Sequence, residues 1–215
     1  MKRNPEFKPN NIIEKKIFKD KEFLAAISIG KPREFHREGT LKNHVKQILE
    51  CIDTKYKSTG YYEDLRIIAL LHDVGKFTLI EKLPELFLPK ISLKEQKKLI
   101  AESRIFKEKY AAPKNIRLDM KQYKLTSGHA YRSYIFAKKF LKDKRILDII
   151  RYHDIAVDFR AINDRTGKYD TNKFKKVFSK VDIKLYLSFL ECDNCNRKDT
   201  ISRWLKNQLR KHKMI

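Results

Sequence analysis

The stretch ALLHDVGK, residues 69–76, sets the interpretation of this chain, because a run of aliphatic residues ends in a histidine and an aspartate. The segment 62–72 is too apolar for a surface helix, which carries only one apolar face. A buried helix is therefore predicted, and its end brings His72 and Asp73 into the core. Neighbouring side chains on a helix point in different directions, so both can reach one point only where the helix ends. We expect Gly75 to allow that turn.

Helical periodicity also dominates the rest of the 215 residues, and alternating strand patterns are scarce. The sequence thus predicts an all-α helical bundle that forms a single domain over residues 1–215. Besides 62–72, helices are expected at 11–27, from Leu41 to before Gly60, and at 92–108, 128–141, 143–153, 171–179, 182–194 and 199–212. Irregular segments are expected at 31–40, around Pro84 and Pro89, and at 113–127. Residues 78–126 are interpreted as a possible insertion that leaves the core.

The charge of the chain is strongly positive. Fifty Lys and Arg against 27 Asp and Glu give a formal net charge of +23. Such a field attracts phosphates, whether of nucleotides, nucleic acids or membrane surfaces. The alternative is compositional, since the chain is also rich in Ile, Asn, Tyr and Phe, as expected from an AT-rich genome.

No membrane partner is expected from the sequence. No segment approaches the roughly 18 uncharged apolar residues that cross a bilayer. The first ten residues, MKRNPEFKPN, contain no apolar export signal. Three cysteines do not form a disulfide framework, so a cytoplasmic location is expected.

Six side chains capable of binding metal lie on the apolar stripes of the predicted helices or, for Asp73, directly after one. They are His44, His72, Asp73, His129, His153 and Asp193. Taken singly, a core histidine bonded to a carbonyl, or an aspartate that caps a helix, would explain each of them. Taken together, two buried carboxylates cost several kcal/mol each unless a positive charge compensates them. No arginine lies on these stripes, so a divalent cation is the better explanation.

The donor types restrict the identity of that cation. Imidazole with carboxylate suits Mn, Fe, Co, Ni or Zn better than Mg alone. Asp73 has two oxygens and could bridge two ions about 3.5–4 Å apart, between which a hydroxide can be held. One or two divalent transition-metal ions are therefore the expected cofactor.

The order of these residues resembles the pattern of the HD superfamily of metal-dependent phosphohydrolases. That all-helical family carries H…HD…D, extended in some members to H…HD…H…H…D. The resemblance covers a core of about residues 31–197. The stretch REFHREGTLKNH, residues 33–44, is similar to the segment that opens the HD domains linked to bacterial tRNA nucleotidyltransferases and poly(A) polymerases. The stretch FSKVDIKLYLSFLECDNCNR, residues 178–197, is similar to the end of those domains, although the nucleotidyltransferase domain itself is missing here.

The resemblance implies a ligand set and a reaction. His44, His72, Asp73 and Asp193 would hold a first metal, and His129 and His153 would hold a second one with Asp73 as the bridge. The implied activity is hydrolysis of phosphoester or phosphoanhydride bonds in nucleotides or RNA ends, including 2′,3′-cyclic phosphates, by metal-activated water. Asp73 and Lys76 would take part in catalysis. The full set of six is also similar to HD enzymes that split dinucleoside polyphosphates and to HD di-iron oxygenases.

Positive and polar residues near the set are candidates for binding the substrate phosphate. They are Lys76, His36, Arg132 and Arg197, and a surface role is the alternative for each. Asp154 repeats the doublet after His153, and we expect it to accept a hydrogen bond or cap a helix rather than bind metal. The basic helix at 199–212 could contact RNA, or it could simply pack on the body.

Two further hypotheses stay open beside the phosphohydrolase. One is an HD-type di-iron oxygenase, which keeps the fold and needs all six ligands. The other is a basic nucleic-acid-binding module with an inert metal site.

Overall fold

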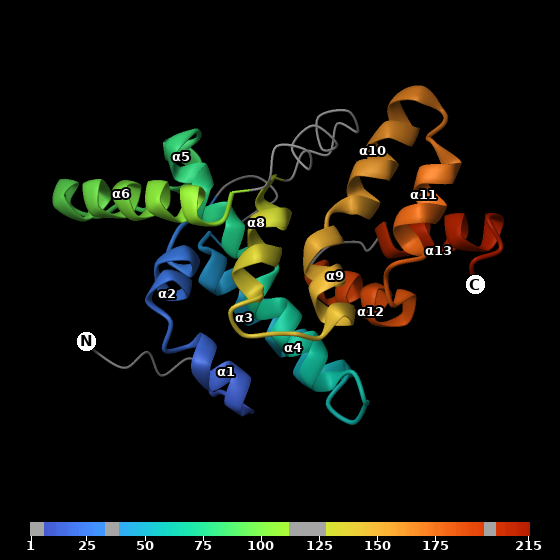
Figure 1. Ribbon diagram of the computed structural model, residues 1–215, viewed down its shortest axis with the longest axis horizontal. Helices are drawn as coiled ribbons and strands as arrows, with labels where there is room; N and C mark the ends of the chain where they lie inside the picture. Colours follow the sequence, from blue (N-terminus) through green and yellow to red (C-terminus); the bar gives the residue numbers. More distant parts are fainter. Residues whose placement is uncertain (1–6, 33–38, 112–127, 196–200) are drawn as a thin grey trace.

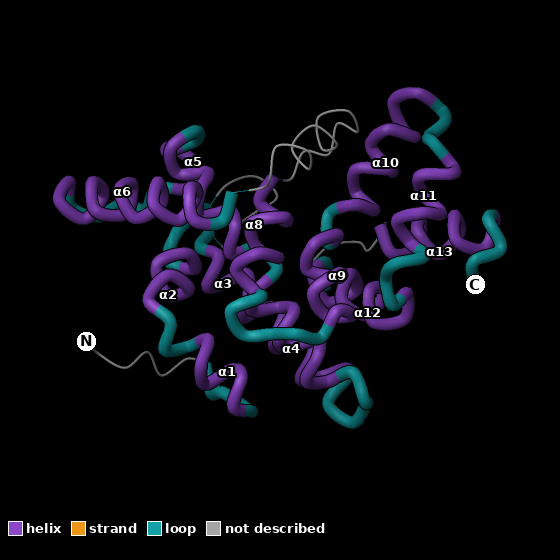
Figure 2. The backbone as a smooth tube through the Cα atoms, in the orientation of Figure 1, coloured by secondary structure: helices purple, strands orange, loops and turns teal. Residues whose placement is uncertain are grey.

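The structure is a computed structural model that describes residues 7–32, 39–111, 128–195 and 201–215. Within these residues every regular element is a helix and none is a strand, which confirms the predicted all-α class (Figures 1 and 2). The elements are α1 Ile12–Ile17, α2 Lys21–Ile27, α3 Leu41–Lys55, α4 Tyr62–Leu71, the 3-10 helix η1 Val74–Glu81, α5 Pro84–Phe87, α6 Leu93–Lys109, α8 Gly128–Ala137, α9 Lys144–Tyr152, α10 Ile155–Thr166, α11 Thr171–Phe178, α12 Ile183–Asp193 and α13 Ile201–Lys211.

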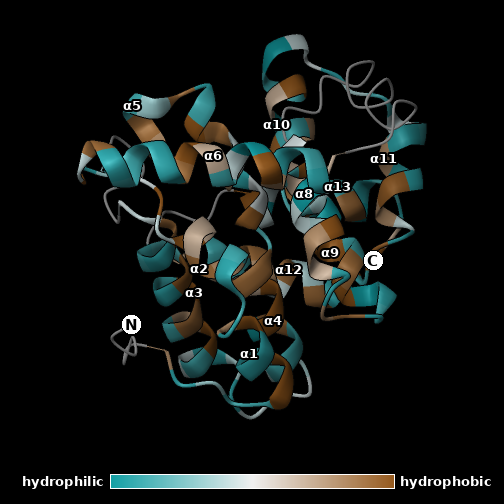
Figure 3. Ribbon diagram, turned by 60° about the vertical axis from the view of Figure 1, so that its left-hand side comes forward, coloured by the Kyte–Doolittle hydropathy of each residue, from teal (hydrophilic) through white to brown (hydrophobic). Residues whose placement is uncertain are grey.

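Helix α4 lies at the centre of the bundle. All residues from Leu65 to Leu71 are buried, and α4 contacts α3, α8, α9 and α12. Figure 3 shows hydrophobic residues gathered where these helices meet. The buried helix predicted before the doublet is thus present, and it places His72 and Asp73 at the point where the surrounding helices converge.

The expected single helix over 11–27 is wrong, because the chain forms two short helices there. Helix α1 ends at Ile17, and the carboxylate of Asp20 accepts a hydrogen bond from the backbone N–H of Phe23 and so begins α2. A capping aspartate stabilises a new helix start better than it stabilises a helix interior. Helix α1 is held to α4 by Glu14, which is fully buried and lies 2.8 Å from the Nε of Arg66.

The segment 74–111, which follows the His72–Asp73 doublet, packs on the core. The predicted loop around the two prolines contains the short helix α5, which begins at Pro84. Ser92 and Glu95 form the capping box that opens α6. Helix α6 then contacts η1 and α2, and the Ser103 hydroxyl donates to the carbonyl of Phe77. The expected irregular stretch at 113–127 lies outside the described residues.

The remaining predicted helices are present near their expected bounds, except that α8 ends at Ala137 rather than at 141. Besides α5, the helices η1 and α10 have no counterpart among the predicted ones. Helix α10 follows α9 after only a short turn and ends at Thr166, and Gly167 caps it with a positive φ of 70°. Helix α13 buries Leu205 and Leu209 and contacts α10 and α12. None of the described helices has the length and apolar character needed to span a bilayer.

Candidate metal centre

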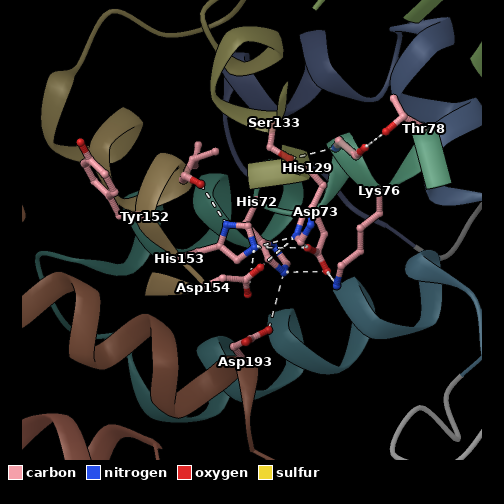
Figure 4. A network of polar contacts seen from close by, with 12 residues as sticks. His72, Asp73, Lys76, Thr78, His129, Ser133, Tyr152, His153, Asp154 and Asp193 are labelled. Atoms are coloured by element: carbon pink, nitrogen blue, oxygen red, sulfur yellow. Dashed lines mark hydrogen bonds and ion pairs between the residues drawn. The ribbon is translucent and has the colours of Figure 1, made fainter. Parts of the chain in front are cut away.

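The structure brings the six predicted side chains together from five helices. Figure 4 labels five of them, all except His44. His44 lies on α3, His72 and Asp73 follow the end of α4, His129 lies on α8, His153 follows the end of α9, and Asp193 ends α12. Their donor atoms form two groups, each compact enough to hold a metal ion.

The first group consists of His44, His72 and Asp193. The Nε2 atom of His44 lies 3.1 Å from Asp193 Oδ1, and the Nε2 atom of His72 lies 3.6 Å from the same oxygen. His72 is only 1% exposed, whereas the side chain of Asp193 is 24% exposed. This group is therefore buried on the α4 side and opens towards solvent beside α12.

The second group consists of Asp73, His129 and His153. Asp73 Oδ1 lies 3.2 Å from His129 Nε2 and 3.3 Å from His153 Nε2. The two Nε2 atoms lie 3.3 Å from each other. Three donor atoms thus surround one small volume.

Asp73 joins the two groups through its two carboxylate oxygens. While Oδ1 faces the second group, Oδ2 lies 3.4 Å from His72 Nε2 and 3.8 Å from His44 Nε2. Asp73 therefore presents one carboxylate oxygen to each group of donors.

Backbone carbonyls fix the orientation of two of the imidazoles. The Nδ1 atom of His72 lies 3.0 Å from the carbonyl oxygen of Ala69, and that of His153 lies 2.9 Å from the carbonyl oxygen of Ile150. An Nδ1–H that donates to a carbonyl leaves Nε2 as the nitrogen with a free lone pair. Both Nε2 atoms face the centre, so these rings are held in the orientation that a metal ligand requires.

Gly75 has a different role from the one predicted. Its φ is not positive, so no turn requires a glycine here. Instead, a Cβ at this position would lie 2.0 Å from the carbonyl oxygen of His129, and the Gly75 N–H donates to Ser133 Oγ at 2.8 Å. The absence of a side chain lets the backbones of η1 and α8 come into contact. This contact places the imidazole of His129 beside the carboxylate of Asp73.

The polar atoms of the centre fit a cation. Among the described residues, His72 Nε2 and Asp73 Oδ1 are buried and make no hydrogen bond of good geometry. Burial alone would raise the pKa of Asp73, but the neighbouring Lys76 ammonium holds it well below its usual range. Burial lowers the pKa of His153, yet the carboxylates of Asp154 and Asp73 outweigh it and raise that pKa to about 9. The carboxylates therefore strongly favour a positive charge among the donor atoms of the centre.

Lys76 reaches the centre from the first turn of η1. Its Nζ lies 2.6 Å from Asp73 Oδ2, and its side chain is 19% exposed. Burial would lower the pKa of Lys76, but Asp73 and Asp154 raise it overall, so the amine stays charged at neutral pH. The predicted phosphate-binding lysine thus lies between the carboxylate bridge and solvent.

Asp154 lies closer to the donor atoms than the sequence indicated. It precedes α10, but its side chain forms no capping hydrogen bond, so the expected capping role is wrong. Its Oδ2 lies 3.1 Å from His129 Nε2, and its Oδ1 lies 3.5 Å from His153 Nε2. The helical stripes gave no signal for this placement, because Asp154 follows the end of its helix.

Of the other predicted substrate-binding residues, Arg132 is the one that the structure describes. The Cβ of Arg132 would lie 3.0 Å from a Cβ on Gly75, which places this arginine where α8 meets η1. His36 and Arg197 lie outside the described residues.

Comparisons of the chain with protein-family models, with curated protein sequences and with solved structures found no match. The functional interpretation therefore depends on the geometry and chemistry of the centre itself.

Proposed function

We propose that this chain is a metal-dependent phosphohydrolase of the HD type, which cleaves phosphoester or phosphoanhydride bonds of nucleotides or RNA ends. The observation that supports the proposal best is the position of Asp73 between two groups of donors, one at each carboxylate oxygen. Paired cation sites that share a ligand are a common arrangement in enzymes that hydrolyse phosphates.

The donor chemistry suits Mn, Fe, Co, Ni or Zn, because imidazole nitrogens and carboxylate oxygens are mixed in both groups. When bound, such cations supply Lewis acidity that makes water a nucleophile near pH 7 and polarises the phosphate. The carbonyls of Ala69 and Ile150 keep the imidazoles of His72 and His153 turned towards the cations. The chain itself therefore contributes preorganisation of the ligands.

The charge balance of the centre favours an anionic substrate. Three carboxylates lie at the centre, those of Asp73, Asp154 and Asp193, and Lys76 lies beside them. Two divalent cations together with Lys76 outweigh these carboxylates. We assign Lys76 to a phosphate oxygen whose negative charge the cations do not neutralise. Its ammonium is suited to this role because it is partly exposed beside Asp73.

The positive charge of the whole chain is consistent with the same substrate class. A net charge of +23 raises the local concentration of phosphate-bearing molecules and speeds their encounter. On α13 the side chains of Arg203, Arg210 and Lys211 are exposed, while the apolar side of that helix packs on the body. This basic face is where we expect an RNA backbone to lie.

Purified protein, loaded with Mn²⁺, Ni²⁺ or Co²⁺, tests the proposal with three substrates: bis-p-nitrophenyl phosphate, p-nitrophenyl phosphate and 2′,3′-cyclic AMP. Turnover that is lost in His72→Ala and in the presence of a chelator is expected. Folded, metal-loaded protein that cleaves none of these would contradict the proposal.

Two additional measurements separate the competing functions. RNA binding that is kept in His72→Ala, without turnover in either protein, would favour the binding module. A mixed-valence iron signal in the electron paramagnetic resonance of iron-loaded protein would favour the di-iron oxygenase.

A further inference from the structure

The carboxylate of Asp154 faces the same nitrogen atoms that are available to a cation. Its two oxygens lie 3.1 Å from His129 Nε2 and 3.5 Å from His153 Nε2. The Nδ1 atom of His153 is already engaged with the carbonyl of Ile150, so Nε2 is the atom that this ring offers to a metal. Asp154 is therefore on the metal side of these rings and not behind them.

A hydrogen-bonding role for Asp154 conflicts with metal binding by the same histidines. An imidazole Nε2 that donates a proton to Asp154 has no lone pair for a cation. If His129 and His153 bind a cation through Nε2, the carboxylate beside those atoms either shares the cation or loses its partners. The first outcome satisfies every donor, and the second leaves the carboxylate to solvent and to the charge of Lys76.

The distances agree with three donors around one ion and with Asp154 beside them. Two donors bound to the same cation at about 2.1 Å lie about 3.0 Å apart in octahedral geometry and about 3.4 Å apart in tetrahedral geometry. The separations of Asp73 Oδ1, His129 Nε2 and His153 Nε2 are 3.2, 3.3 and 3.3 Å. Asp154 contacts the two imidazoles through different oxygens, Oδ2 at 3.1 Å from His129 Nε2 and Oδ1 at 3.5 Å from His153 Nε2, so it lies beside the group of three, and one oxygen must turn towards the ion to bind it.

We infer that Asp154 is the fourth protein ligand of the second cation, which would then be held by two imidazoles and two carboxylates. The inference deepens the proposed function, since it depends on the metal centre proposed above. Asp154 is 32% exposed, whereas Asp73 is 4% exposed, so Asp154 closes the second site on its solvent side. Burial would raise the pKa of Asp154, but His153 and His129 hold it below its ordinary value, so the carboxylate is ionised at neutral pH.

The test is the number and affinity of Mn²⁺ ions bound by metal-free protein at one fixed pH, measured by equilibrium dialysis and titration calorimetry. Wild-type protein is expected to bind two ions. Asp154→Asn is expected to keep the first ion and to weaken the second by about a hundredfold or more, since even the outer hydrogen-bonding partners of ligands are worth 10- to 100-fold. Asp164→Asn makes the same charge change on α10 at a side chain that is 58% exposed, and should bind as wild type does.

Each outcome has a separate meaning. Two ions bound by Asp154→Asn with unchanged affinity would overturn the inference and leave the phosphohydrolase proposal intact. Fewer than two ions in wild type would overturn both the inference and the two-metal centre. Two ions that depend on Asp154, without any turnover, would support the inference and contradict the phosphohydrolase.

A measurement without a mutation guards against a variant that fails to fold. In crystals of the wild-type chain grown with Mn²⁺, an Asp154 oxygen is expected about 2.0–2.3 Å from the second ion, the usual range for a bound carboxylate. A separation well beyond this range, with the second ion present, would show that Asp154 is not a ligand.

Discussion

The backbones of Gly75 and His129 are in direct contact, so that a Cβ on Gly75 would lie 2.0 Å from the carbonyl oxygen of His129. This contact joins η1 to α8 only two residues after Asp73. The position of the second group of donors relative to the first therefore depends on a residue that has no side chain and no role in metal chemistry.

Gly75→Ala should destabilise the fold and weaken the second cation site more than the first. The added methyl group meets backbone atoms, which cannot move away as a flexible side chain can, and overpacking of this kind costs about 1–3 kcal/mol. Urea unfolding and Mn²⁺ titration measure the two effects. Gly60→Ala is the matched control, because nothing lies within 4 Å of a Cβ at Gly60. Equal metal binding by both variants would refute this role of Gly75.

Lys76→Met should separate substrate binding from metal binding. The Lys76 ammonium lies 2.6 Å from Asp73 Oδ2 and competes with a cation for that oxygen. We expect the affinity for the first Mn²⁺ ion to stay the same or to rise, while turnover of phosphoesters falls by about a hundredfold, a typical loss for one stabilising group. Lys82→Met removes the same charge from an exposed position nearby and should change neither property. Full turnover in Lys76→Met would exclude Lys76 from the reaction.

Glu22 should make the stability of the chain depend on pH. Burial would raise the pKa of Glu22, but hydrogen bonds from Lys139, Tyr110 and Lys109 outweigh it and lower the pKa to about 2. The stabilisation is therefore complete above about pH 4.5 and is lost as the pH falls towards 2. Its size is about 1 kcal/mol after allowance for the partly exposed setting of Glu22.

Urea unfolding of wild type and Glu22→Gln at pH 6 and pH 3 checks this dependence. The difference in unfolding free energy should shrink at pH 3, because wild type loses the contribution that the variant never had. Glu85→Gln, at an exposed position, serves as the control. A difference that is the same at both pH values would contradict the assignment.

The buried pair of Glu14 and Arg66 should contribute strongly to the attachment of α1. Glu14 is fully buried, and Arg66 donates to both of its carboxylate oxygens, at 2.8 and 3.2 Å. Glu14→Gln leaves the buried Arg66 guanidinium with Asp53 as its remaining carboxylate partner, so the substitution should cost about 3 kcal/mol, the lower end for a broken buried pair. Glu50→Gln, at the exposed pair with Lys46, should cost less than about 1 kcal/mol in the same thermal and urea unfolding experiments. A similar loss of unfolding free energy in Glu14→Gln and Glu50→Gln would contradict the stronger contribution of the buried pair.

The sequence predicted the helical class and the inward-facing donors because both follow from periodicity. A residue that continues an apolar stripe of a helix must face the same side as that stripe. His44 and His129 could be placed in this way, and the structure puts both of them at the centre. The apolar run before His72 likewise predicted the buried helix that the structure contains.

Three other features could not be predicted in the same way. The direction of the Asp154 side chain depends on how α9 turns into α10. The apolar stripe of α9 does not predict the direction of a side chain in that turn. The break between α1 and α2 depends on a single cap at Asp20, within a run that otherwise has helical period. The role of Gly75 depends on a contact with α8, far away in the sequence, which local turn chemistry does not reveal.

The central claim is that Asp73 lies between two cations held by histidines and aspartates from five helices. The most direct test is anomalous X-ray diffraction from crystals of the chain grown with Mn²⁺. Two anomalous peaks about 3.5–4 Å apart are predicted, one beside each carboxylate oxygen of Asp73. Crystals with no peak at this centre, or with Mn²⁺ only at unrelated surface carboxylates, would contradict the claim.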